Sequence, residues 1–149
     1  ARRAGHLVNF SSMAGILGIP GVALYCAAKH AVSGLSEALA GELAPFGIRV
    51  ALIEPAQVST TFAAKIHTLP PEDSPYRERA RRFIARDDEL IKTAPTPLQA
   101  ARRIVEVIHR DRPAFHNQVD FMSTFFLFLN RFLPVGLRDR ILLNHMDIQ

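Results

Sequence analysis

The chain has 149 residues, of which 48% are hydrophobic, and this suffices for one domain whose core needs no disulfide or metal support. Its single cysteine, Cys26, cannot form an internal disulfide, which argues against a cross-linked secreted scaffold and favours a cytoplasmic protein. The formal net charge of +4 comes partly from an arginine-rich segment that also carries acidic residues, a mixture typical of a solvated helix and not of a nucleic-acid-binding surface.

The first third of the chain has the pattern strand, helix, strand. The apolar run at residues 6–10 predicts a buried strand, and the Gly- and Pro-rich residues 15–21 predict a loop after it. Residues 23–44 carry helix-forming side chains with apolar positions at helical intervals, so we expect a long helix there. The nearly unbroken apolar run at 48–53 predicts a second buried strand, parallel to the first.

The predicted helix over 23–44 has small side chains along one side. They are Ala27, Ala31, Gly34, Ala38 and Gly41. Each glycine costs roughly 1 kcal/mol relative to alanine, so we expect a close contact to compensate. That contact is either another helix, in a homo-oligomer formed through this helix, or the domain's own sheet.

Residues 63–96 contain four of the ten prolines and the charged cluster. We expect a mobile segment with a helix around 76–92 that forms a lid over a site. Pro97 and the amphipathic pattern after it predict another helix, which ends near Asp111. A weaker strand is expected at 114–119.

Residues 120–149 form an apolar tail in which we expect helices. Several side chains interrupt the apolar pattern and make it a poor membrane span. They are Asn130, Arg131, Pro134, Arg138 and Arg140. A helix that covers the core or contacts another subunit is one interpretation. Contact with a membrane surface, where the arginines would meet anionic head groups, is the other.

Tyr25 and Lys29 are four residues apart at the start of the long helix, so they share one face with Cβ atoms about 5–6 Å apart. A neighbouring ammonium favours the phenolate, and lowering a tyrosine pKa from about 10 by three units requires about 4 kcal/mol of differential stabilisation. Tyr25 could then exchange protons near neutral pH. Ser12 follows the first strand, at the edge where open α/β sheets bind ligands, and could hold a carbonyl oxygen.

Four segments occur in a fixed order and spacing between residues 5 and 62. They are Val8-Asn9-Phe10-Ser11-Ser12-Met13-Ala14-Gly15, Tyr25-Cys26-Ala27-Ala28-Lys29, Gly47-Ile48-Arg49-Val50 and Glu54-Pro55-Ala56-Gln57-Val58-Ser59-Thr60. Together they resemble the C-terminal portion of the short-chain dehydrogenase/reductase family. The resemblance implies an α/β fold, namely the C-terminal half of a doubly wound, Rossmann-like parallel sheet with flanking helices. Residues 1–149 would be the catalytic part of a single domain.

The resemblance also implies an oxidoreductase that uses NAD or NADP and a small-molecule carbonyl or alcohol substrate. Tyr25 would be the catalytic acid and base, and Lys29 would bind the nicotinamide ribose and lower the Tyr25 pKa. Ser12 would position the substrate carbonyl. The family spacing of thirteen residues to Tyr25 selects Ser12, and we expect its neighbour Ser11 to shape the loop.

The segment after the second strand would contact the nicotinamide end of the cofactor through Pro55, Val58 and Thr60. Two positions depart from the family pattern, which usually has glycine at Ala56 and often has serine at Ala28. We expect Ala56 to restrict a turn that glycine would permit. Neither departure removes a catalytic group.

The family's Gly-rich dinucleotide loop, its residue that selects NAD or NADP, and its catalytic asparagine all precede the matched region. Because the chain also lacks an initiator methionine, we expect it to be part of a longer protein. A non-catalytic remnant that serves as a dimerisation or scaffold module through the 23–44 helix is the alternative function.

Two further expectations concern the site. The 63–96 segment and the Phe-rich tail could enclose an apolar substrate of moderate size. Cys26 is expected to face the core and not to act as a nucleophile, since no histidine stands at a motif spacing from it. The histidines show no metal-ligand spacing, so no metal is expected.

Overall fold

The computed structural model of the chain is built around a parallel sheet. It describes residues 4–62, 65 and 69–148. Within these residues, β1 (Gly5–Phe10) pairs with β2 (Ile48–Ile53), and β2 pairs with β3 (His116–Asn117), all in parallel. The first two strands lie where the apolar runs predict them, while the third is much shorter than the predicted 114–119.

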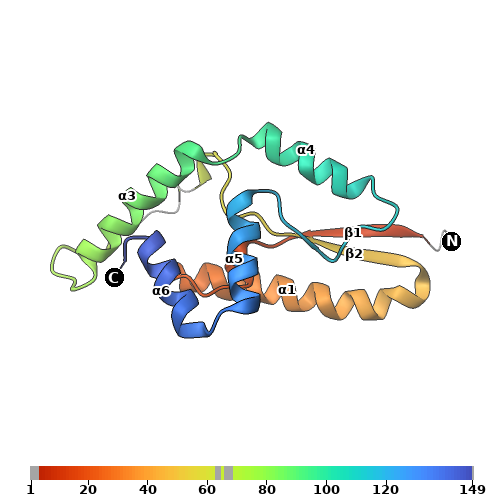
Figure 1. Cartoon of the computed structure of the whole chain (residues 1–149), viewed down its shortest axis with the longest axis horizontal. Helices are drawn as coiled ribbons and strands as arrows, with labels where there is room; N and C mark the ends of the chain where they lie inside the picture. Colours follow the sequence, from red (N-terminus) through yellow and green to blue (C-terminus); the bar gives the residue numbers. More distant parts are fainter. Residues whose placement is uncertain (1–3, 63–64, 66–68, 149) are drawn as a thin grey trace.

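The sheet is covered on both faces, by α1 (Ala23–Leu43) on one side and α4 (Pro97–Ile108) on the other (Figure 1). Ala51 and Ile53 of β2 pack with Val107 of α4. On the α1 side, the Asn9 side chain of β1 donates a hydrogen bond of 2.9 Å to the Ser36 hydroxyl of α1. Because both faces are covered, β2 needs an almost continuous apolar sequence, which is the pattern that predicts it.

The ends of these helices follow from local chemistry. After α1, a short 3-10 helix, η2 (Ala44–Phe46), leads to Gly47, whose φ of 71° lies in the left-handed region that glycine adopts without strain. At the start of α4, the Thr96 and Gln99 side chains form a reciprocal capping box. The helices predicted at 23–44 and after Pro97 are therefore both present.

The two glycines on the small-residue side of α1 have no close neighbour among the described residues. A Cβ atom built on Gly34 or Gly41 would meet nothing within 4 Å among the described residues. Only Cys26 and Ser36 of α1 are buried. The expected close contact is thus not made by the domain's own sheet, whereas the expected burial of Cys26 is observed.

A second core lies where the C-terminal helices meet the loop after β1, which contains η1 (Met13–Gly15). Its buried members are Met13, Leu17, Phe126, Leu129, Leu142, Met146 and Ile148. They come from η1, from α5 (Phe121–Phe132), from α6 (Val135–His145) and from the residues beside them. This core positions the C-terminal tail against one end of the sheet.

The helix predicted around 76–92 is present as α3 (Arg77–Thr93), which lies beside the C-terminal residues (Figure 1). Arg86 Nε donates to the His145 carbonyl oxygen at 2.8 Å, and Arg79 donates to that of Ile148. Residues 63–64 and 66–68 of the expected 63–96 lid lie outside the described residues. No helix in the described part of the chain is long and apolar enough to cross a membrane.

Candidate active site

The site lies at the carboxyl ends of β1 and β2, where the chain leaves both strands. Backbone pairing continues past the strands, because Ser11 N donates to Ile53 O and Met13 N to Pro55 O, each at 2.9 Å. Ser12 is held between these two bonds and is buried. Its hydroxyl accepts a hydrogen bond from Ala14 N and donates one to Pro55 O, both at 3.2 Å.

Ser11 faces the opposite direction and fixes the loop to α1. Its hydroxyl donates to Lys29 O at 3.1 Å and lies 2.9 Å from the Ser33 hydroxyl. Gly15 approaches the same helix so closely that a Cβ atom there would lie 2.2 Å from Ser11 Oγ and 2.9 Å from Lys29 O. The tight loop therefore requires glycine at position 15, a constraint that the sequence alone does not reveal.

Tyr25 and Lys29 lie in the first turns of α1, as their spacing predicts. Tyr25 is half-buried, and its ring centroid is 6.2 Å from that of Phe62. Lys29 Nζ lies 5.6 Å from the Tyr25 ring centroid and donates to the carbonyl oxygen of Phe10, the last residue of β1, at 3.1 Å. The ammonium is thus close to the phenol ring but bonded to the end of the strand.

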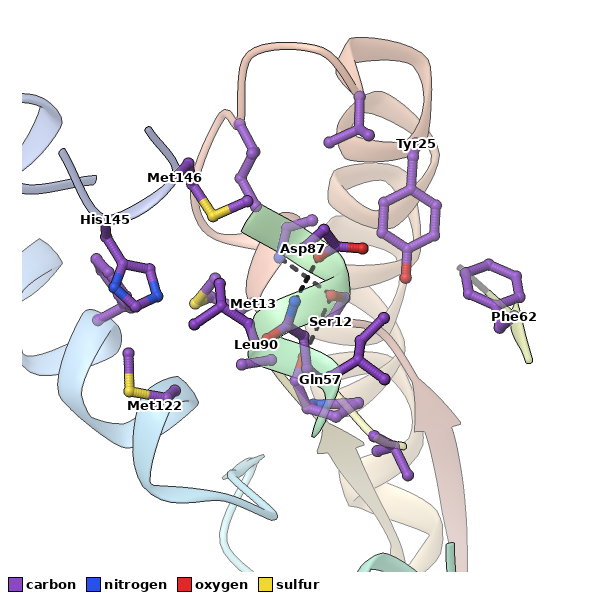
Figure 2. A pocket seen from close by; sticks show the side chains of 18 of the residues that line it. Ser12, Met13, Tyr25, Gln57, Phe62, Asp87, Leu90, Met122, His145 and Met146 are labelled. Carbon is purple, nitrogen blue, oxygen red and sulfur yellow. Dashed lines mark hydrogen bonds between the residues drawn. The ribbon is translucent and has the colours of Figure 1, made fainter. Parts of the chain in front are cut away.

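A cavity of about 250 Å³ opens at this point (Figure 2). Five of the six expected site residues line it, namely Ser12, Tyr25, Pro55, Val58 and Thr60. Lys29 is not among the lining residues. Most of the remaining lining is apolar and comes from η1, α3, α5 and the residues around the end of α6.

Helix α3 contributes Phe83, Asp87 and Leu90 to the cavity lining. The Gln57 side-chain amide donates to Asp87 Oδ1, which connects α3 to the segment after β2. Ser59 N also donates to Pro95 O at 2.9 Å. The spacings of four and three place the three α3 residues on one helical face, a signal by which sequence reasoning could have found them.

The segment after β2 is also fixed from the side of β3. Glu54 is fully buried, and His116 Nδ1 donates to its carboxylate, 3.0 Å from each oxygen. Gln118 donates to the same carboxylate at 3.1 Å. Burial raises the pKa of the Glu54 carboxyl, and the hydrogen bond and charge of His116, followed by the bond from Gln118, partly oppose this.

Ala56 follows this cluster and is held by its backbone. Its N–H donates to Asp120 Oδ2 at 2.8 Å, while Oδ1 of the same carboxylate caps α5 through Ser123 N at 2.7 Å. The described non-glycine residue with positive φ is Asp147, so Ala56 adopts an ordinary backbone conformation. Alanine at this position therefore carries no left-handed backbone strain.

A parallel α/β sheet with a cavity at the carboxyl ends of its strands defines a class of ligand-binding α/β proteins. Similarity to known proteins identifies the family within this class. The family model described as short chain dehydrogenase matches residues 1–69. The 3-ketodihydrosphingosine reductase of Bacteroides thetaiotaomicron is 33% identical over 119 residues, which cover 78% of this chain and 44% of that protein.

Two further relatives agree. The 17-beta-hydroxysteroid dehydrogenase type 1 of Mus musculus is 30% identical over 140 residues, which cover 91% of this chain and 38% of that protein. The crystal structure of a short chain dehydrogenase/reductase from Burkholderia phymatum in complex with NAD matches with a TM-score of 0.66 at 26% identity, over 86% of this chain and 46% of that chain. The chain belongs to the short-chain dehydrogenase/reductase family, and it spans less than half the length of these relatives.

Proposed function

We propose that this chain is the C-terminal, catalytic part of an enzyme that transfers hydride between NAD or NADP and a carbonyl or secondary alcohol. The observation that carries the proposal is the common cavity of Ser12, Tyr25 and the segment after β2. This arrangement provides a proton donor and a second hydroxyl beside a space that a small molecule can enter. Residues 1–149 would then belong to a single catalytic domain.

The residues present fit the nicotinamide end of a dinucleotide. Pro55 and Val58 offer apolar walls, and Thr60 offers a hydroxyl that accepts from Phe62 N at 3.3 Å and keeps its own proton free to donate. When bound, the cofactor supplies or receives the hydride. The Burkholderia phymatum relative, which is in complex with NAD, supports this assignment.

In the direction of reduction, Tyr25 would donate its phenolic proton to the oxygen of the carbonyl that the cofactor reduces. This would leave Tyr25 as a tyrosinate, and solvent would return the proton to it. Lys29 supplies a positive charge near the phenol and a donor for the ribose hydroxyls. The Ser12 bond to Pro55 is longer than the usual 2.7–2.8 Å, so its hydroxyl can turn to the substrate oxygen.

The substrate is proposed to be largely apolar. Leu90, Met122 and Phe126 line the cavity together with other apolar side chains, as in most small-molecule sites. The relatives described as a 3-ketodihydrosphingosine reductase and a 17-beta-hydroxysteroid dehydrogenase support this substrate class by their names. The 63–96 segment would act as the lid, and residues 120–149 would form the opposite wall.

We also infer that α1 mediates a homo-oligomer. Leu24 and Leu35 are 89% and 57% exposed, and the small side chains between them leave room for a second helix. The same surface favours the second candidate function, a scaffold module without catalysis. We further propose that the protein is cytoplasmic and contacts a membrane surface through its C-terminal tail. The exposed Phe128 and Phe132 side chains of α5 support this contact.

Titration with NAD and NADP tests the proposal against the scaffold alternative. The complete protein should bind one of the two cofactors, and Thr60→Val should weaken that binding by about tenfold through the lost hydroxyl contact. Thr61→Val, at the exposed neighbouring position, is the matched control. Absence of binding by the complete protein would favour the scaffold function.

A further inference from the structure

Among the described residues, two polar side chains of the cavity lining have no hydrogen-bond partner, and they lie on opposite sides of the cavity (Figure 2). One is the Tyr25 hydroxyl and the other is the His145 ring, with Ser12 and Leu90 between them (Figure 2). Within the described residues, neither group makes a hydrogen bond. Tyr25 has its role in the proposed reaction, whereas the reaction leaves His145 without one.

The remaining polar groups of the lining are engaged. Gln57 and Asp87 are bonded to each other, Thr60 accepts from Phe62 N, and Ser12 has two backbone partners. His145 is instead surrounded by apolar side chains. Met122 and Met146 lie near it in the lining (Figure 2), and the Phe126 ring contacts it.

Packing fixes the position of the His145 ring. It contacts the Phe126 ring edge to face, with centroids 5.3 Å apart. Its backbone carbonyl accepts from Arg86 Nε at 2.8 Å, which connects the last residue of α6 to α3. Every fully buried polar side-chain atom among the described residues has a hydrogen-bond partner. The His145 ring nitrogens have none among these residues, so they are not fully buried. In this half-buried residue they remain accessible from the cavity.

The environment also determines which groups the ring can bind. Burial, and then the charge of Arg86, lowers the pKa of His145 below its ordinary value, so the ring is neutral near pH 7. A neutral imidazole offers one donor and one acceptor, which match a hydroxyl or a carbonyl. The Asp87 carboxylate in the same lining opposes a negatively charged group.

We propose that His145 binds an uncharged hydroxyl or carbonyl group at the end of the substrate remote from the reacting carbon. The inference rests on the proposed function and narrows its substrate class to elongated, mostly apolar molecules with a second polar oxygen. Tyr25 and Ser12 hold one end of such a molecule, and His145 holds the other.

Two ketones with the same carbon skeleton test this, one with a hydroxyl at the remote end and one with a methyl group there. The complete wild-type protein with its cofactor should show a kcat/KM about tenfold or more in favour of the hydroxylated ketone. His145→Leu should bring that ratio close to one. His145→Gln, which retains a donor and an acceptor, should keep part of it.

His109→Leu is the matched control, because His109 is exposed at the end of α4 and should leave the ratio unchanged. Equal kcat/KM values for the two ketones in the wild type would overturn the inference but agree with the proposed function. An unchanged ratio in His145→Leu would also overturn it. Should that variant not fold, an unchanged ratio in His145→Phe, which keeps an aromatic ring but has no hydrogen-bonding group, has the same meaning. Absence of wild-type turnover of both ketones would contradict the proposed function and the inference with it.

Discussion

The Ser12 hydroxyl donates a hydrogen bond of 3.2 Å to the carbonyl oxygen of Pro55. The second residue after β1 is thereby attached to the second residue after β2, although 43 positions separate them in the sequence. Both lie in the cavity lining with Tyr25. The loop after β1 and the segment after β2 thus form one surface of the cavity. The position of this surface depends on how tightly the loop and the segment pack against the neighbouring helices.

Gly15→Ala tests the packing of the loop after β1. The new Cβ would lie 2.2 Å from Ser11 Oγ and 2.9 Å from the backbone oxygen of Lys29, and that backbone atom cannot move freely. We expect a loss of about 1–3 kcal/mol in the free energy of unfolding, measured by denaturant titration. Gly18→Ala, whose Cβ meets nothing within 4 Å, is the control. Equal stability of the two variants would contradict the described loop geometry.

Phe126→Ala tests the second core. The Phe126 side chain is 1% exposed and lines the cavity, so its truncation should lower the free energy of unfolding by about 3–5 kcal/mol. Phe128 lies on the same helix but is 59% exposed, and Phe128→Ala should cost far less. Thermal unfolding of both variants measures the two losses. A comparable loss of stability in each would show that Phe126 does not lie on the buried face of α5.

The buried Glu54 carboxyl should make stability depend on pH. Its pKa is raised in the folded protein above the ordinary value of 4.5, so its contribution is fully present below about that pH and is lost as pH rises through the folded pKa. Glu54→Gln removes this dependence, and its melting temperature relative to the wild type should therefore increase as pH rises above 4.5. The exposed Glu42→Gln is the control, and parallel curves for Glu54→Gln and wild type would contradict the assignment.

The hydrogen bond between Gln57 and Asp87 should hold α3 against the segment after β2. A hydrogen bond to a charged group contributes about 1.5–3 kcal/mol, so Asp87→Ala should raise KM for an apolar ketone about tenfold or more. The adjacent, exposed Asp88→Ala is the control. If steady-state kinetics gave both variants the same KM, the bond would have no part in holding the site closed.

The sequence predicts the regular elements well and the cavity incompletely, for a physical reason. The helix over 23–44 and the strand at 48–53 have long uniform patterns that depend on local periodicity. His145 reaches the cavity only through the packing of α6, which local periodicity does not specify. The strand expected at 114–119 forms only at His116–Asn117, because the chain then turns to cap α5 with Asp120.

Tyr25→Phe tests the central claim most directly. The variant keeps the ring and its contact with Phe62 but removes the hydroxyl that would exchange the proton. General acid–base catalysis contributes about 10²–10⁴-fold, so kcat of the complete enzyme should fall at least 100-fold. Tyr76→Phe, at the other tyrosine, which is 67% exposed, should leave kcat unchanged. A Tyr25→Phe enzyme that turns over within a few-fold of the wild type would contradict the account.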